Sequence, residues 1–451
     1  MKSTILSVVL VLQSISLLFA QENKTTGLSL QQCVKTAVEK NINVQTARID
    51  QEKSGYKVSE TRAALLPKID IKGSFQDNLV LPTTVLPGEI FGQPGTSIAA
   101  KMGTNYNTNA SINLNQVLYN QTALIALKLS KKSAALNTLG VEKAREEQAF
   151  DVSKLYFLSL TTARQKQLLE ENIARTKHLS DIVKIRVDNG MSKQVDYERA
   201  SVNLENLYTQ LSNTEATLEQ QLNLIKYTLE MPLDESIALT DTAEMILLRV
   251  SPELMSDFSN HIDIQMLESQ KEINGLNPKM IKSGYLPSLS FTGQYVNQGM
   301  RQEFKNYFQS SPENNWFGSS YIGLSLSIPV FDGLEKRSKS RQAKLDYQKT
   351  EITLDNTKKR FSVNYQNTLN NYQNQKNNVQ RQKQNIALAE NVYKETALKY
   401  REGLSTMSDL LQDEMALNNA QANYLNALYN FKEDELKIMS LNGEIRNLFN
   451  K

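Results

Sequence analysis

Residues 66–76 read LPKIDIKGSFQ, and residues 286–296 read LPSLSFTGQYV. In both stretches a Leu-Pro pair precedes a run of alternating apolar and polar residues, and the copies are 220 positions apart, as from Pro67 to Pro287. Alternation at a period of two is the pattern of a β-strand with one apolar and one polar face. The sequence therefore predicts two equivalent strands at these places.

The duplication continues beyond these strands. Asn41–Gln45 corresponds to His261–Gln265 at the same spacing of 220, and Asn189–Ser192 corresponds to Glu402–Ser405 at a spacing of 213. We therefore expect two structural repeats, each with a helix, two strands and a long helical hairpin. The repeats are predicted to span residues 21–240 and 241–451, with strands at about 67–79, 106–118, 287–298 and 320–331 and hairpin tips near 188–192 and 401–405.

The first twenty residues, 1–20, have the pattern of a secretory signal peptide, with basic Lys2, an apolar stretch that begins at Ile5, and small Ala20 at the expected cleavage point. After residue 20, no apolar run approaches the ~18–20 residues that a membrane-spanning helix requires. We therefore expect this exported chain to enter a membrane only as strands. The single cysteine, Cys33, has no partner for an intrachain disulfide and is predicted to be a small buried hydrophobe.

Composition argues against nucleic-acid binding and against catalysis. The 51 Lys and Arg and the 48 Asp and Glu give a net charge of +3 that is spread over the whole length, without the basic face of a nucleic-acid binder. The two histidines, His178 and His261, lie in no metal-ligand spacing, and the sequence shows no phosphate loop and no paired nucleophile and base. We expect no nucleic acid, metal or cofactor and no enzymatic activity.

Two segments, about 121–188 and 334–402, contain almost no turn signals and predict helices of unusual length. The first has 68 residues. At ~1.5 Å per residue this helix would be roughly 100 Å long. Each helix is followed by a glycine suited to the left-handed closing position, Gly190 or Gly403. Ser192 or Ser405 is then expected to cap the helix that returns.

The two returning helices keep apolar residues at every seventh position. A seven-residue repeat drifts around a straight helix unless the helices supercoil left-handed, so this pattern predicts antiparallel coiled-coil hairpins. The repeating residues are Tyr197, Leu204, Leu211, Leu218 and Ile225 in one helix and Leu410, Leu417, Tyr424, Phe431 and Ile438 in the other.

Strands can cross a membrane only as a closed barrel, because every backbone polar group inside a bilayer must be paired. The smallest membrane barrels have eight strands. Four strands per chain therefore require at least two copies, and more naturally three, which would give twelve strands. The apolar faces should meet lipid and the polar faces should line a water-filled lumen. The predicted lumen residues are Lys68, Asp70, Lys72, Asn113 and Asn115.

The order of the motifs resembles that of a known family. LSLQQCVKTAVEKN opens the chain at residues 28–41, Ala64–Pro67 precedes the first strand, Val330–Gly333 follows the fourth, and Tyr400–Leu411 forms the second tip. This order is similar to that of TolC-like outer membrane efflux proteins, over nearly the whole mature chain. The resemblance implies an α+β membrane protein, a homotrimer in which four strands per protomer form a twelve-stranded transmembrane β-barrel that continues as a long antiparallel coiled-coil α-barrel.

The resemblance also implies a function and partners. The expected function is an exit duct of the bacterial outer membrane, extending into the periplasm, for a tripartite efflux or type I secretion system. The implied partners are a periplasmic adaptor (membrane fusion) protein, an inner-membrane pump of the RND or ABC type, and outer-membrane lipid. Energy would come from the pump, so the duct itself needs no catalytic residue.

The resemblance places two groups of residues at the periplasmic end. Asp409 matches an acidic position of the family's entrance, Tyr400 matches a tyrosine that helps to hold the closed state, and the next family aspartate is Gln412 here, with Asp413 beside it. The helix dipole also favours an aspartate in a first helical turn, and Asp196 occupies that place in the other repeat. The gate candidates are Tyr400, Asp409, Asp413 and Asp196, and the adaptor-contact candidates are Asn189, Gly190, Met191, Ser192, Glu402, Gly403, Leu404 and Ser405.

Two alternatives stay open at this point. A periplasmic coiled-coil scaffold or adaptor without a membrane barrel would explain the seven-residue repeat, although it would not explain four alternating strands. Within the channel interpretation, drug or metal efflux and protein secretion are both compatible with the sequence.

Membrane fractionation separates the channel from the scaffold. We expect the protein to stay with the membranes through high-salt and carbonate washes, because apolar strand faces are held by lipid and not by charge. Release of the protein by either wash would contradict the barrel and favour the scaffold.

Overall fold

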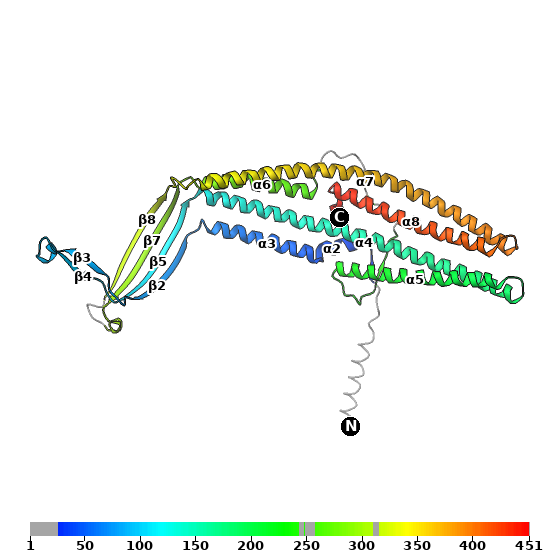
Figure 1. Ribbon diagram of the computed structural model, residues 1–451, viewed down its shortest axis with the longest axis horizontal. Helices are drawn as coiled ribbons and strands as arrows, with labels where there is room; N and C mark the ends of the chain where they lie inside the picture. The colour runs from blue at the N-terminus through cyan, green and yellow to red at the C-terminus, as the bar shows by residue number, and fades with distance from the viewer. Residues whose placement is uncertain (1–25, 243–247, 249–257, 310–314, 451) are drawn as a thin grey trace, which may run out of the picture. The chain divides into compact units, whose positions relative to one another are not determined.

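The computed structural model describes residues 26–242, 248, 258–309 and 315–450, and the predicted signal peptide lies outside them. Figure 1 shows the order of the elements along the chain. The chain forms two compact units, and each contains parts of both sequence repeats. The helical unit comprises Met1–Gln51, Asn137–Glu268 and Ile352–Lys451, and the strand unit comprises Glu52–Leu136 and Ser269–Glu351.

The described elements lie on both sides of the predicted boundary between the repeats, at residues 240 and 241. The first repeat contains β1 (Thr26–Leu28), α2 (Leu30–Lys40), α3 (Ile42–Ala63), β2 (Lys68–Asp77), β3 (Thr83–Pro87), η1 (Gly88–Phe91), β4 (Ser97–Lys101), β5 (Tyr106–Tyr119), α4 (Gln121–Asp188), α5 (Gln194–Thr228) and β6 (Ile237–Leu239). The second contains α6 (Ile262–Ser283), β7 (Ser288–Arg301), η2 (Phe304–Tyr307), β8 (Trp316–Ser327), α7 (Glu335–Arg401), α8 (Met407–Leu441) and η4 (Ile445–Leu448).

Three short features were not predicted. The Pro- and Gly-rich segment between β2 and β5 contains β3 and β4, which pair as an antiparallel hairpin of their own. In the helical unit, β1 and β6 pair in parallel. Asn41 divides the first short helix into α2 and α3. Each feature is too short to give a periodic pattern in the sequence.

The strand unit contains one antiparallel sheet in the order β2-β5-β7-β8. Its register sets Asp70 opposite Asn113, and Asn113 opposite Gln294. Directly opposed residues of antiparallel strands lie on the same face of a sheet. The polar residues of β2, β5 and β7 therefore share one face. The apolar residues share the other, because the register sets Ile69 opposite Leu114 and Gly293 opposite Ile322.

The two outer strands of this sheet leave apolar side chains and backbone groups uncovered. Ile71 of β2 is 78% exposed and Ile322 of β8 is 79% exposed. Among the described residues, no other strand pairs with the outer edge of β2 or of β8. An exposed, flat edge is a template for pairing with another strand. The sheet of one chain therefore presents two edges and an apolar face that need partners.

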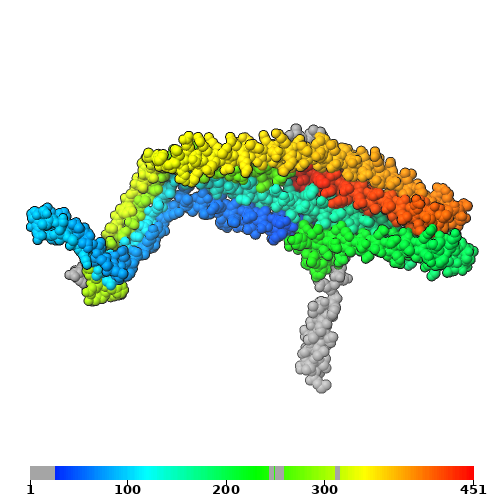
Figure 2. Space-filling view, viewed as in Figure 1, coloured from blue at the N-terminus to red at the C-terminus, as the bar shows by residue number. Residues whose placement is uncertain are grey.

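The helical unit is built from helices that pack along seven-residue seams. Leu207 of α5 is buried against Leu169 and Ile173 of α4, with Leu204 and Leu211 packed around them. Tyr372 of α7 stacks on Phe431 of α8 at 5.3 Å between ring centroids. In the space-filling view, α8 is seen between α7 and α5 (Figure 2). Among the helices of the described residues, none has an apolar stretch long enough to cross a membrane.

The main core of the helical unit surrounds Cys33 on α2. Cys33 is fully buried, and burial raises the pKa of its thiol to about 12. A thiol with so high a pKa is neutral and behaves as a small hydrophobe. The prediction for Cys33 is therefore confirmed.

Equivalent helices of the two repeats begin with different caps in the same geometry. The side chain of Asn41 accepts a hydrogen bond from the amide of Asn43 at 2.9 Å, and Nδ1 of His261 accepts one from the amide of Asp263 at 3.2 Å. Asn41 is 5% exposed and His261 is 7% exposed. Because Nδ1 accepts this bond, His261 must be neutral while it caps α6.

Burial leaves the pKa of His261 below the usual value of 6.5. Burial lowers the pKa, Asp263 opposes this effect, and Lys143 and Arg446 add to it. The unfolded chain therefore takes up more protons than the folded chain as the pH falls below 6.5. Stability from this cap is present at neutral pH and is lost on acidification.

Substitution of His261 by Asn, which copies the other repeat, tests this cap. We expect wild-type α6 to lose roughly 1 kcal/mol of local stability between about pH 7.5 and 5.5, the usual value of an N-cap, and His261→Asn to lose much less. Amide hydrogen exchange at the start of α6 measures the difference. His261→Ala should be weakened at both pH values, and an equal acid response in wild type and His261→Asn would contradict the assignment.

Candidate functional site

The candidate site is formed by the ends of the two long hairpins in the helical unit. Gly190 and Gly403 both adopt positive φ angles, +70° and +78°. The next residue donates its amide to a carbonyl five positions back, from Met191 to Arg186 at 2.7 Å and from Leu404 to Lys399 at 2.8 Å. These bonds close α4 and α7 in the left-handed geometry that glycine permits. Both tips therefore turn at the predicted glycines.

The predicted serine caps are wrong. The residue before α5 is Lys193, whose side chain makes no capping bond, and the cap of α8 is Thr406. Thr406 and Asp409 form a reciprocal capping box: the amide of Asp409 donates to Thr406 Oγ1 at 3.2 Å, and the amide of Thr406 donates to Asp409 Oδ2 at 3.0 Å. Each returning helix begins later than expected, which takes Ser192 and Ser405 out of the capping position.

Asp409 is exposed and ionised. Its carboxylate also accepts hydrogen bonds from the hydroxyls of Thr406 at 2.7 Å and Ser405 at 3.2 Å. The bonds from Thr406, with a smaller contribution from Ser405, hold the pKa of Asp409 below its usual value. The carboxylate thus stabilises α8 and also carries charge into the solvent at the tip. Asp413 lies one turn farther along α8 and is half-buried.

Tyr400 links the two hairpins within one chain. Its ring is buried with Val183 and Met407 in a small apolar cluster. The guanidinium of Arg186 lies over this ring at 5.6 Å and donates to the carbonyls of Tyr400 at 3.4 Å and Arg401 at 2.8 Å. The last carbonyls of a helix carry partial negative charge, so a cation is favoured there. Arg186, on α4, therefore holds the end of α7.

Asp196, on α5, faces the same cluster. Burial, followed by the charge of Asp196, raises the pKa of Tyr400. The structure thus brings Tyr400 and Asp196 together and places Asp409 and Asp413 on successive turns of α8. The sequence interpretation missed Arg186. The sequence shows Arg186 only as a basic residue in the last turn of α4, before Gly190. That position alone does not reveal its contact with the other hairpin.

The tips expose apolar side chains to solvent. Met191 and Leu404, the residues that follow the two glycines, are both largely exposed. Of the eight predicted contact residues, Ser192 and Ser405 are half-buried and the others are exposed: Asn189, Gly190, Met191, Glu402, Gly403 and Leu404. Exposed apolar residues at the end of a hairpin are suited to contact with another protein.

The predicted lumen residues share the polar face of the sheet in the strand unit. Asn113 donates to Asp70 at 3.0 Å and accepts from Gln294 at 2.7 Å, so polar side chains of three strands are joined. Lys72 lies 3.5 Å from Asp70, and the register sets Lys68 opposite Asn115. The face thus carries charges of both signs.

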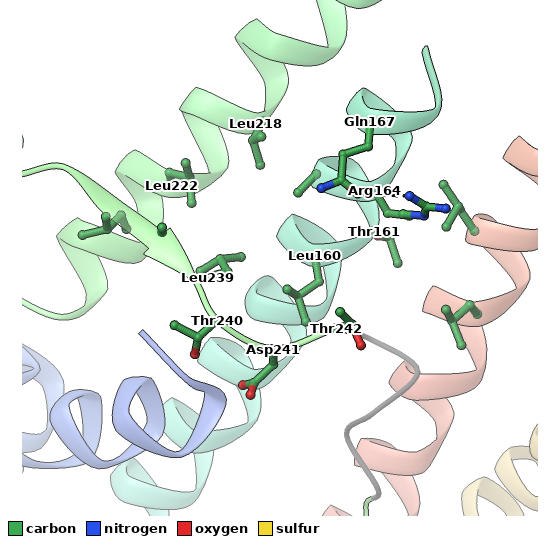
Figure 3. A pocket seen from close by; sticks show the side chains of 15 residues that line it. Leu160, Thr161, Arg164, Gln167, Leu218, Leu222, Leu239, Thr240, Asp241 and Thr242 are labelled. Atoms are coloured by element: carbon green, nitrogen blue, oxygen red, sulfur yellow. Dashed lines mark hydrogen bonds between the residues drawn. The ribbon is translucent and has the colours of Figure 1, made fainter. Parts of the chain in front are cut away.

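The helical unit also contains a cavity of about 690 Å³ between α4, α5, β6 and α8. Figure 3 shows leucines along its walls, with Arg164 and Gln167 on one side. Asp241, in the same lining, already accepts hydrogen bonds from the Leu30 amide at 2.8 Å and the Tyr156 hydroxyl at 2.9 Å. Across the described part of the chain, no group of three or more His, Cys, Asp or Glu side chains could hold a metal ion.

Comparison with known proteins gives consistent matches. The family described as Outer membrane efflux protein matches residues 33–228 and 260–444. Outer membrane protein TolC of Escherichia coli is 20% identical over 443 residues, which cover 92% of this chain and 82% of TolC. TolC of Vibrio cholerae is 20% identical over 398 residues, which cover 86% of this chain and 84% of that protein.

Solved structures show the same fold. The CmeC outer membrane channel of Campylobacter jejuni superposes with a TM-score of 0.75 at 17% identity, over 94% of this chain and 86% of CmeC. The outer membrane protein VceC of Vibrio cholerae superposes with a TM-score of 0.73 at 14% identity, over 92% of this chain and 96% of VceC. The chain therefore has the fold of these two outer membrane proteins.

Proposed function

We propose that this chain, which belongs to the outer membrane efflux protein family, is the exit duct through which a tripartite efflux or type I secretion system passes its substrates out of the cell. Proteins of this family are located in the bacterial outer membrane and extend into the periplasm, and this chain is one of them. Family membership excludes the periplasmic scaffold without a barrel. The observation that carries the proposal is the two-faced sheet, whose outer edges on β2 and β8 pair with no strand of the described residues.

The open edges support a ring of copies. In a membrane the unpaired backbone groups of β2 and β8 have no water to bind, so each edge requires another strand. Pairing β8 of one copy with β2 of the next satisfies both edges by one repeated contact, as in a cyclic oligomer. Three copies give twelve strands, within the range of membrane barrels. A homotrimer is therefore the proposed assembly.

Aromatic residues support the assignment of the apolar face to lipid. Phe75 stacks on Tyr106 at 6.0 Å between centroids, and Phe304 contacts the edge of Phe75 at 5.9 Å. Trp316 begins β8 at the same loop end of the sheet. Membrane barrels carry aromatic belts where the apolar band meets the lipid head groups. The opposite face, with Lys68, Asp70, Lys72, Asn113 and Asn115, then lines the water-filled lumen.

The hairpin tips are proposed to meet the partner proteins. The apolar side chains of Met191 and Leu404, together with the turn residues beside them, form the surface for a periplasmic adaptor, and the adaptor connects the duct to an inner-membrane pump of the RND or ABC type. Tyr400 and Arg186 hold the two hairpins together in the closed entrance, Asp196 faces the same cluster, and Asp409 and Asp413 place negative charge there. The pump supplies the energy, so the duct is not an enzyme and needs no cofactor.

Reconstitution tests the proposed function. We expect the protein purified in detergent to have the mass of three chains and to give discrete ion conductance in planar bilayers, because three sheets close around water. The mature chain without membranes or detergent should aggregate, since its apolar strand face has no partner. A monomer that stays soluble without detergent and gives no conductance would contradict the proposal.

Substitution of Asp409 tests the charged entrance. We expect Asp409→Ala to reduce the preference for cations over anions and to weaken the block by divalent cations, because the entrance loses one carboxylate per chain. The measurements are the reversal potential in a salt gradient and the current with added divalent cation.

Thr406→Ala is the matched control, since it removes the capping hydroxyl, at a cost of about 1 kcal/mol, and keeps the carboxylate. Its ion selectivity should equal that of wild type. Equal changes in both variants would mean that Asp409 acts only as a cap.

A further inference from the structure

The seam of α8 has an apolar row and a mixed row. The first row is that of Leu410, Leu417, Tyr424, Phe431 and Ile438. The second, also spaced by seven, is Met407, Glu414, Gln421, Leu428 and Glu435. Both rows face inward, and Glu414 is fully buried. An ionisable group in such a seam is costly unless it is paired, so its surroundings indicate what it does.

The carboxyl of Glu414 contacts both helices of the other hairpin. One of its oxygens lies in hydrogen-bond contact with the hydroxyl of Thr176 on α4. The other accepts a hydrogen bond from the side-chain amide of Asn203 on α5 at 2.9 Å. Asn172 lies one helical turn from Thr176 on α4. Its side-chain amide donates hydrogen bonds to the side chains of Asn418 at 2.5 Å and Gln421 at 3.2 Å. A short run of polar contacts thus joins α8 to the α4–α5 hairpin, near the tips.

These contacts are satisfied in one alignment of the helices. If α8 slipped by seven residues, Met407 or Gln421 would face Thr176 and Asn203, and Glu414 would be buried without them. Polar residues in the seam of a coiled coil select the register in this way. Glu414 is therefore suited to fix the position of the second hairpin against the first.

The neutral form of Glu414 fits the protons that these contacts share. The Thr176 hydroxyl has one proton and lies near two oxygens, Glu414 Oε1 and, at 2.9 Å, the carbonyl of Asn172. The carbonyl can only accept. When Thr176 donates to it, as threonines in helices commonly do, the bond between Thr176 and Glu414 needs a proton from Glu414. A protonated carboxyl satisfies Thr176, Asn172 and Asn203 together.

The surroundings of Glu414 also favour its neutral form. Burial raises its pKa, although Thr176, Arg175 and Asn203 oppose the shift. Arg175 of α4 is the cation that faces it, but the guanidinium donates to Asn172 and lies over the ring of Tyr393 on α7 at 5.8 Å. Tyr393 is a second titratable group that faces it, and α5 contributes the neutral Asn203. Ionised Glu414 would lack a directly bonded cation.

We propose that protonated Glu414 is a positioning residue that locks the second hairpin to the first near the entrance, and that its ionisation releases the second hairpin, so that the duct opens more readily as the pH rises. The inference rests on the proposed function, since it assigns a regulator to the same entrance. The closed state holds the neutral acid. The open state, in which the hairpins separate, exposes the carboxylate to water.

The test is the pH profile of the reconstituted trimer in planar bilayers between about pH 5.5 and 8.5. Wild type should open more often at the higher pH, by roughly tenfold if the closed and open states differ by one pKa unit. Glu414→Gln stays neutral and keeps the size of the side chain. Its frequency of opening should not change with pH and should equal that of wild type at low pH. Glu395→Gln removes an exposed carboxylate of α7 that pairs with Lys399 at 2.9 Å, and it should keep the wild-type profile.

Hydrogen exchange in α8 gives a second readout. Protection around Glu414 should fall between the same pH values in wild type and stay constant in Glu414→Gln, after correction for intrinsic exchange rates. An unchanged wild-type response in Glu414→Gln, by current or by exchange, would overturn the proposal. If wild type gives no conductance at any pH, the channel function itself fails, and the exchange experiment still decides whether Glu414 locks the hairpins.

Discussion

Unpaired backbone groups on the outer strands are the constraint on which this protein depends. In the part of the chain that the structure describes, four long antiparallel strands form a sheet with a polar face and an apolar face, and this sheet ends at β2 and β8 with open hydrogen-bonding edges. Neither water nor lipid suits both the apolar face and the open edges. In the proposed assembly identical copies would solve the problem, because the open edge of one chain would pair with the open edge of the next. Assembly would then be part of how each chain completes its fold.

The helices face a different problem, since similar seven-residue seams can pack in several alignments. Apolar rows such as that of Leu207 on α5 supply most of the burial but distinguish poorly between one register and the next. Buried polar contacts remove this ambiguity, as Asn172 does with Asn418 and Thr176 does with Glu414. Stability and alignment therefore come from different residues. In the proposed duct, loss of the polar contacts would release one hairpin from the other, while the apolar contacts within each hairpin would remain.

Periodic features could be predicted from the sequence, and contacts between distant segments could not. Helix α4 begins and ends at the predicted residues, and the long strands lie within four residues of their predicted ranges, because periods of two and seven are visible in a single sequence. The tips could be predicted from Gly190 and Gly403, because the left-handed turn there depends only on the backbone geometry that glycine permits. The predicted caps at Ser192 and Ser405 were wrong, because the sequence does not show how many residues separate each glycine from the start of the returning helix. Arg186 and Glu414 were missed since their partners lie far along the chain.

The duplicated architecture has a consequence for how the two halves diverge. Asn41 and His261 make the same capping bond in equivalent places, yet only one of the two side chains can titrate. An internal duplication lets one copy keep a pH-independent bond while the other becomes sensitive to acid, with no change to the backbone. Each half of the molecule can therefore be compared with the other, position by position. Matched positions at which only one side chain can titrate mark where the halves differ in their response to pH.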